Sequence, residues 1–240
     1  MKKLTIALAL LMLVFLAAPA KSVTQKEMGF IEINTSVTKE IAPDTATITF
    51  SVETSAKDSE TASAANKEIS NTLIENLKPM LDFFNKGDTI QTKNLHLSPE
   101  YTYERNSSKK NLVGYTMTNT IIVKTKKLEN VPKLVDTAVA NKATNVSDLR
   151  FYVENEEVFL ASLIKEATKK AETISRLSAE SLGQKINGVK SINISYGPGY
   201  ENYPRTYAVK AADSVSGAST PVEQGKVKMQ VNINAKFYVK

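Results

Sequence analysis

Between Asn155 and Gly183, hydrophobic residues recur at steps of three and four, and charged residues fill many of the positions between them. This spacing predicts one long amphipathic helix over about residues 155–183. Its apolar face consists of Leu160, Leu163, Ile164, Ala167, Ala171, Ile174 and Leu182. Asn155 is expected to cap the start of the helix, and Gly183 to end it in a left-handed conformation. A helix with one apolar face needs a partner, and we expect this one to pack on a β-sheet.

Alternating segments predict the strands of that sheet. They cover about residues 29–37, 45–53, 89–104, 112–125, 149–153, 189–196 and 227–239. Pro43-Asp44 marks a turn between the first two segments, which are therefore expected to form a hairpin. The last segment alternates most regularly, with apolar residues on one face and mostly polar residues on the other, so it is expected to lie inside the sheet.

Two shorter helices complete the pattern. The first is expected to start at Asp58 or Ser59 and to end or kink at Pro79, because proline removes a backbone donor and clashes with the preceding turn. The second is expected over about residues 131–140, with Asn130 as its cap and a proline tolerated in its first turn.

The order of these elements predicts the fold class. It runs strand, strand, helix, strand, strand, helix, strand, long helix, strand, strand. Two similar blocks predict an α+β protein with two β-β-α type lobes, about residues 29–110 and 111–240, and mixed, mainly antiparallel sheets. One larger mixed sheet with its helices on one face is the alternative that the pattern leaves open.

The first 20 residues have the pattern of a secretory signal peptide. Two lysines precede a nearly uninterrupted apolar run from Leu4 to Leu16, and Ala18-Pro19-Ala20 supplies the small residues of a cleavage site. The run is shorter than the ~18 residues of a membrane-spanning helix, which disfavours an uncleaved anchor. We therefore expect cleavage after Ala20 and a mature periplasmic or secreted protein, residues 21–240, with no transmembrane segment.

Composition and charge exclude several classes of site. The chain of 240 residues contains no cysteine, so disulfides, thiolate metal sites, cysteine nucleophiles and lipid attachment at a cysteine are excluded. Lysine and arginine total 31 against 25 acidic residues, a formal net charge of +6, but most of the basic residues are scattered among acidic ones. This distribution favours a solvated surface over a polyanion site, and export argues against nucleic acid as a partner.

No residue pattern points to catalysis, a cofactor or a metal. His96 is the only histidine, and its neighbours predict a strand with no sharp serine-bearing turn, so we interpret it as an exposed or edge-strand residue. Glu156 and Glu157 are explained by their place at the positive end of the long helix. Phosphate-loop, dinucleotide-binding and zinc-protease motifs are absent from the sequence. The sequence therefore predicts a non-enzymatic protein without catalytic, cofactor-binding or metal-binding residues.

A candidate interaction arm lies between the last two predicted strands. Residues 196–225 have no usable periodicity and contain several glycines and prolines, so the segment is either a mobile loop or an arm that contacts a partner. Tyrosine and arginine are enriched at protein interfaces, which favours the arm. Its candidate contact residues are Tyr196, Tyr200, Tyr203, Arg205 and Tyr207. Tyr101 and Tyr103, on a predicted strand, are interpreted as core or interface residues.

Short motifs spread along the chain resemble one family. They are Pro43-Asp44-x-Ala46-x-Ile48, Gly114-Tyr115 followed by Asn119, Ile121 and Val123, the long helix ending in Leu182-Gly183, and Thr220-Pro221-Val222-x-x-Gly225. Their order and spacing are similar to those of the SIMPL-domain family, which includes YggE-like and Brucella periplasmic immunogenic protein-like members. One departure is Lys142-Ala143-Thr144-Asn145, where the family has a Gly-Ala-Asn turn. Asn141 or Asn145 is expected to adopt the left-handed conformation there.

The resemblance implies an exported, two-part α+β protein that forms homo-oligomers and is associated with envelope and oxidative stress. It implies no catalytic residue, cofactor or substrate. We therefore expect a non-enzymatic envelope protein that self-associates through strand edges and the tyrosine-rich arm, with a protective or scaffolding role. The alternative is a binding module for an envelope ligand, such as a glycan, a lipid or a small molecule.

Overall fold

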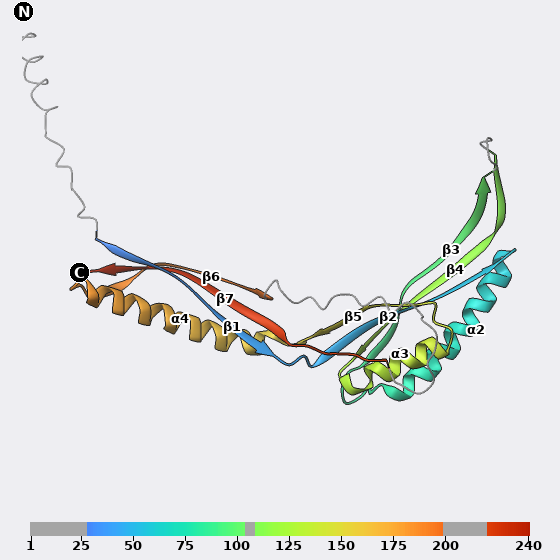
Figure 1. The fold of residues 1–240 in the computed structure, drawn as a ribbon, viewed down its shortest axis with the longest axis horizontal. Helices are drawn as coiled ribbons and strands as arrows, with labels where there is room; N and C mark the ends of the chain where they lie inside the picture. Colours follow the sequence, from blue (N-terminus) through green and yellow to red (C-terminus); the bar gives the residue numbers. More distant parts are fainter. Residues whose placement is uncertain (1–27, 104–108, 199–219) are drawn as a thin grey trace, which may run out of the picture.

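The computed structural model describes residues 28–103, 109–198 and 220–240, which form two separate β-sheets along an elongated molecule (Figure 1). One sheet has three strands and the other has four, and their strand pairs are antiparallel. Helices lie on one face of each sheet (Figure 1). The predicted α+β class with mainly antiparallel sheets is therefore confirmed, and the alternative of one larger sheet is wrong.

The three-stranded sheet brings together both ends of the described chain. β1 (Phe30–Ile41), β7 (Val227–Val239) and β6 (Ile186–Pro198) lie in the order β1-β7-β6. The C-terminal strand β7 is central, as its regular alternation predicted. The long helix α4 (Glu156–Ser181) packs on one face, mainly against β1 and β7.

The core of this half lies between α4 and the sheet. Leu163, Ala167 and Ala171 of α4 are fully buried there. The sheet residues that pack in the same cluster include Ile33, Val231, Ile233, Ala235 and Phe237. The two alanines let the helix lie close to the strands, and the alternation of β1 and β7 leaves their polar residues on the opposite face.

The four-stranded sheet is formed by the middle of the chain, in the order β3-β4-β2-β5. Its strands are β2 (Thr45–Ala56), β3 (Thr89–Tyr103), β4 (Lys110–Thr125) and β5 (Asn145–Tyr152). The helices on one face are α2 (Ser59–Leu77) and α3 (Val131–Ala140), with short 3-10 helices at Lys78–Met80 and Leu128–Asn130. The centre of this core is formed by Ile48, Phe50, Leu73, Leu77, Ile121 and Leu134, all fully buried.

The expected hairpin between the first two strands is wrong. β1 pairs with β7, whereas β2 pairs with β4 and β5 in the other sheet. The backbone N–H of Asp44 donates to the carbonyl of Tyr152 at 3.1 Å, which starts β2 beside β5 instead. Alternation sets which face of a strand is buried, but it does not choose the neighbouring strand.

The chain passes between the two sheets at more than one point. Residues 45–152 build the four-stranded half, and β1, α4, β6 and β7 build the other. The expected lobe boundary near residue 110 falls between β3 and β4, which are paired. One crossing runs from β1 to β2 and another from β5 to α4, and Asp44 joins the two. Its Oδ1 accepts hydrogen bonds from the backbone N–H of Glu154 at 2.9 Å and from the Thr45 hydroxyl at 2.8 Å. The division into two independent lobes stays a prediction.

Several expected helix ends are confirmed. Asp58 caps α2, with its carboxylate accepting a hydrogen bond from the backbone N–H of Thr61 at 2.7 Å. The helix ends at Leu77, two residues before Pro79, as expected from the missing donor of proline. Gly183, just beyond α4, has φ +68°, the left-handed conformation predicted for it.

The two asparagine caps are not formed as expected. Asn155 and Asn130 stand at the starts of α4 and α3, but neither side chain makes a capping hydrogen bond. The Asn130 side chain donates to the carbonyl of Met80 at 2.8 Å instead. A tertiary partner thus replaces the local one, and this asparagine joins the start of α3 to the end of the segment that follows α2.

The left-handed residue after α3 is a lysine. Lys142 has φ +65°, so the expectation for Asn141 or Asn145 is wrong. Asn141 still belongs to the last helical turn, because its backbone N–H donates to the carbonyl of Thr137 at 3.0 Å. The next residue is therefore the one that leaves the helix, and a lysine there has the steric cost that glycine avoids.

Candidate assembly surfaces

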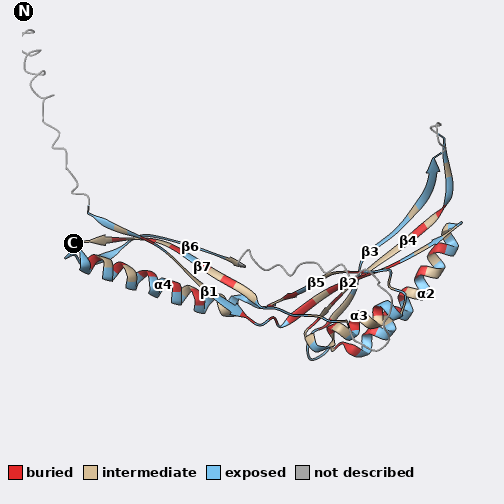
Figure 2. Ribbon diagram, viewed as in Figure 1, coloured by how far each residue is buried: buried red, intermediate tan, exposed pale blue. Residues whose placement is uncertain are grey.

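β6 forms one edge of the three-stranded sheet, and α4 covers its apolar face only in part, at Ile186 and Ile194. Ile192 pairs with Ala235 and Tyr196 with Val231, so these side chains lie on the face that carries the core. α4 packs mainly on β1 and β7, and Val189, Ile192 and Tyr196 are left 56%, 44% and 61% exposed. None of the β6 side chains that the structure describes is buried, in contrast to β7 beside it (Figure 2). We call Val189, Ile192 and Tyr196 the β6 surface.

β3 forms an edge of the four-stranded sheet in the same way. α2 packs mainly on β2 and β4, and β3 with β4 projects beyond the helix as a long hairpin (Figure 1). The register places Leu95 and Leu97 beside Asn119 and Met117 of β4, on the face that carries the core. Four apolar or aromatic side chains of β3 are between 40% and 70% exposed: Leu95, Leu97, Tyr101 and Tyr103. We call these four residues the β3 surface.

Both surfaces combine apolar side chains with the edge of a sheet. An edge strand presents backbone donors and acceptors along its outer side, where another strand can pair with it. A group of exposed apolar residues beside such an edge is typical of an interaction surface. The arrangement is therefore suited to association with another chain through strand pairing and apolar burial.

Of the predicted interaction arm, only Tyr196 lies within the described residues. It belongs to β6 and is part of the β6 surface. Tyr200, Tyr203, Arg205 and Tyr207 lie outside the residues that the structure describes. Tyr101 and Tyr103 are exposed, so their interpretation as core residues is wrong. Their interpretation as interface residues stays a prediction.

Sequence reasoning missed the aliphatic members of both surfaces. Ile192 and Leu95 alternate with polar neighbours just as core residues do, and alternation predicts only that they face the helix side of a sheet. Whether a helix covers them depends on the strand order and on the width of the sheet relative to the helix. The only local signal is weak: both strands are rich in asparagine, serine or lysine between the apolar positions.

The one histidine lies on the edge strand β3, as expected. The His96 side chain is exposed, and its Nε2 lies 2.7 Å from the Ser98 hydroxyl. Glu156 and Glu157 stand in the first turn of α4, where the helix dipole favours them. Among the described residues there is no cluster of three or more metal-ligating side chains that could hold a metal ion.

One carboxylate has a strongly perturbed pKa, and it lies at the crossing between the sheets. Hydrogen bonds from Lys124 and Lys126 lower the pKa of Glu154 from 4.5 to about 2. The distance from Lys124 Nζ to Glu154 Oε1 is 2.7 Å, and Lys126 contacts the other carboxylate oxygen. Glu154 lies between β5 and α4, and the two lysines lie at the end of β4 and just after it, so this cluster ties the two halves of the molecule together.

The motifs behind the family resemblance have structural roles. A Cβ on Gly114 would lie 2.6 Å from the carbonyl oxygen of Ala56, so only glycine lets β4 approach the end of β2. The hydroxyl and backbone N–H of Thr220 donate to the Asp136 carboxylate at 2.5 and 3.2 Å, which attaches this part of the chain to α3. Asp44 joins the crossings between the sheets. Each of these contacts holds two parts of the fold together.

Within the described ranges, no helix combines the length and the apolar character needed to cross a membrane. A family model described as SIMPL, protein of unknown function (DUF541), matches residues 31–237. The chain is 24% identical to the uncharacterized protein YggE of Edwardsiella ictaluri, over 99% of this chain and 98% of that protein. It is also 24% identical to the 26 kDa periplasmic immunogenic protein of Brucella melitensis, over 83% of this chain and 80% of the relative, and it matches the Brucella abortus protein to the same extent.

Proposed function

This chain belongs to the SIMPL family, and we propose that it is a non-enzymatic periplasmic protein that assembles into homo-oligomers through the β3 surface and the β6 surface. Its proposed role is to protect or scaffold the cell envelope, including under oxidative stress. The signal-peptide pattern and the periplasmic name of the Brucella relatives support the location.

The observation that carries the proposal is that each sheet keeps an edge strand with several exposed apolar or aromatic side chains on it, because the helices cover these edges only in part. Two such surfaces on one copy allow it to contact two neighbours, so repeated contacts produce assemblies larger than a dimer. A contact between β3 of one copy and β6 of the next repeats head to tail and closes into a ring where the rotation permits. Contacts of β3 with β3 and of β6 with β6 would instead each be two-fold symmetric.

Lysine substitutions test each surface separately. Ile192→Lys on the β6 surface and Leu95→Lys on the β3 surface place a charge on a partly exposed edge side chain, which the fold tolerates and strand pairing does not. We expect each to lower the native mass of the chain expressed from Lys21, measured by size exclusion with light scattering. Val158→Lys, at an exposed residue of α4 outside both surfaces, is the matched control and should leave the mass unchanged.

A mixture of the two variants shows which surface meets which. If β3 pairs with β6, each variant alone is a monomer, and an equimolar mixture forms a heterodimer because one intact β3 surface meets one intact β6 surface. If each surface pairs with itself, each variant alone is a dimer. Variants that keep the mass of the unchanged chain would refute assembly through these surfaces.

The tyrosine-rich arm is a second proposed contact. Replacing Tyr200, Tyr203 and Tyr207 together by serine should lower the native mass and leave the far-UV circular dichroism unchanged, because the change removes aromatic side chains of the arm and replaces no residue of either described core. An unchanged mass would remove the arm from the proposal.

The protective role is tested in cells. A strain that lacks the protein should lose viability faster in peroxide than its parent, and the unchanged gene should restore survival. The Ile192→Lys variant, present at equal abundance in the periplasm, should not restore it. Full restoration by this variant would show that protection does not require assembly through the β6 surface.

A further inference from the structure

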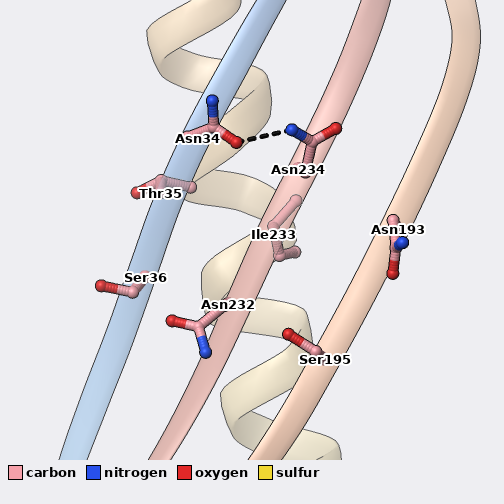
Figure 3. A pocket seen from close by; sticks show the side chains of 8 residues that line it. All are labelled: Asn34, Thr35, Ser36, Asn193, Ser195, Asn232, Ile233 and Asn234. Carbon is pink, nitrogen blue, oxygen red and sulfur yellow. Dashed lines mark hydrogen bonds between the residues drawn. The ribbon is translucent and has the colours of Figure 1, made fainter.

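The face of the three-stranded sheet opposite α4 carries a grid of uncharged polar side chains (Figure 3). In the strand register, Asn34 of β1, Asn234 of β7 and Asn193 of β6 form one row. The next row consists of Ser36, Asn232 and Ser195. These six residues line a shallow, open hollow with a volume of about 470 Å³. We call them the amide grid.

Period-two alternation builds the amide grid, but strand formation does not explain its composition. Ile233 points back toward α4 and is buried in the core, so Asn232 and Asn234 on either side of it point to the outer face (Figure 3). Neighbours in the grid are about 4.8 Å apart across the strands and about 6.6 Å apart along them. Asparagine is depleted in β-strands, so a row of three asparagines is not what strand stability would select.

Much of the hydrogen-bonding capacity of the amide grid is unused within the protein. The Asn234 side chain donates to Oδ1 of Asn34 at 2.6 Å and to Glu32 at 2.9 Å, and the Asn232 side chain accepts from Gln230 at 2.8 Å. Three other side chains make no hydrogen bond to any of the described residues: Ser36, Asn193 and Ser195. Amides and hydroxyls each offer both donors and acceptors, so the grid presents the two kinds of group side by side.

Charged residues lie beyond the amide grid rather than within it. Glu32 and Lys236 form an ion pair at 3.4 Å next to one end of the grid. The Lys190 ammonium lies 4.1 Å from the centre of the Phe30 ring near the same end. The six grid residues themselves are neutral, so they suit a ligand that is rich in hydroxyl and amide groups and carries no charge.

We propose that the amide grid binds a neutral glycan chain built from N-acetylated sugars. An acetamido group carries one N–H donor and one carbonyl acceptor, so it pairs reciprocally with a side-chain amide, while sugar hydroxyls pair with the serines. Pockets for small molecules enclose most of the ligand, whereas this flat hollow is open and accepts an internal stretch of a polymer. The proposal does not rest on self-assembly, because the grid lies on the sheet face opposite the β6 surface.

Calorimetric titration with chitohexaose, a soluble β-linked hexamer of N-acetylglucosamine, tests the proposal on the chain expressed from Lys21. The double variant Asn193→Ala/Ser195→Ala removes two side chains without described partners, so the fold is kept and binding should weaken about tenfold. Ser36→Ala, on the other edge of the grid, should weaken binding about threefold. Asn94→Ala, at an exposed asparagine of β3, is the matched control and should bind as the unchanged chain does.

Cellohexaose keeps the hydroxyls of the probe but lacks its acetamido groups, and it should bind at least about fivefold more weakly. Equal binding of the two oligosaccharides would overturn the assignment to N-acetylated sugars. The proposal as a whole is overturned if chitohexaose does not bind at millimolar concentration or if the double variant binds it unchanged. If chitohexaose does not bind and the double variant has a lower native mass than the unchanged chain, a second copy of the chain covers this face instead.

Discussion

Asn66 determines how α2 sits on the four-stranded sheet. It is 1% exposed, and its Nδ2 donates to the carbonyl oxygens of Val52 in β2 and Met117 in β4, both at 2.9 Å. Its Oδ1 accepts a hydrogen bond from the buried Ser70 hydroxyl at 3.1 Å. These contacts hold the helix over β2 and β4, and this placement leaves Leu95 and Leu97 of β3 exposed.

Replacing Asn66 by alanine removes a side chain that makes three hydrogen bonds. The Ser70 hydroxyl can turn to a backbone carbonyl one helical turn earlier, so the two strand carbonyls carry most of the cost. Both carbonyls also lie in the continuous β2–β4 ladder and keep their strand partners, so the variant loses hydrogen bonds worth about 0.5–1.5 kcal/mol each rather than leaving the carbonyls unpaired. We therefore expect the free energy of unfolding to fall by about 2 kcal/mol, which lowers Tm by about 4–8 °C for a chain of this size.

Urea unfolding followed by circular dichroism, at one fixed protein concentration, measures this loss. Asn76→Ala is the matched control on the same helix, because Asn76 is exposed and should cost less than about 0.5 kcal/mol. Asn66→Asp should be more destabilising at pH 7 than at pH 4, because only the protonated carboxyl can donate to a strand carbonyl. If Asn66→Ala unfolds within about 0.5 kcal/mol of the unchanged chain, the role assigned to Asn66 is refuted.

Three further predictions concern single positions. Gly114→Ala should lower the free energy of unfolding by about 1–3 kcal/mol, because its Cβ would clash with the backbone of Ala56. Gly197→Ala is the comparison, since a Cβ there meets none of the described residues within 4 Å, and equal melting temperatures of the two variants would contradict the prediction. Lys142→Gly should raise the free energy of unfolding by about 0.5–1 kcal/mol by removing left-handed strain, and an unchanged urea midpoint would count against it. Because the pKa of Glu154 is lowered to about 2, its ion cluster stabilises the fold fully above about pH 4.5 and is lost as the pH falls toward 2. Glu154→Gln should therefore be less stable than the unchanged chain at pH 6 and equally stable near pH 2. The difference at pH 6 should be less than about 1 kcal/mol, since the carboxylate is partly exposed. A difference in melting temperature that does not depend on pH would argue against this.

Features that depend on residues close together in the sequence could be predicted. The three- and four-residue steps of α4 and the alternation of β7 state directly which face is buried, and the structure has both. The Asp58 cap and the end of α2 before Pro79 involve contacts or steric limits within a few residues. Gly183 could be predicted because glycine adopts a left-handed conformation at little cost.

Features that depend on distant residues could not be predicted. Pairing of β1 with β7 brings together the two ends of the described chain, and no local pattern identifies such a partner. Asn66 lies on the buried face of α2, where its side chain donates to two strand carbonyls, and the helical period alone does not show that a polar side chain has partners there. The exposure of Ile192 and Leu95 follows from which strands the helices cover, so it appears only when the strand order is known.

The native mass of the chain expressed from Lys21 tests the central claim most directly. It is measured by size exclusion with light scattering over a range of concentrations, for the unchanged chain and for the double variant Leu95→Lys/Ile192→Lys. Assembly through the β3 surface and the β6 surface predicts a discrete species of several subunits for the unchanged chain and a folded monomer for the double variant. An unchanged chain that stays monomeric at every concentration, or a double variant with the mass of the unchanged chain, would contradict it.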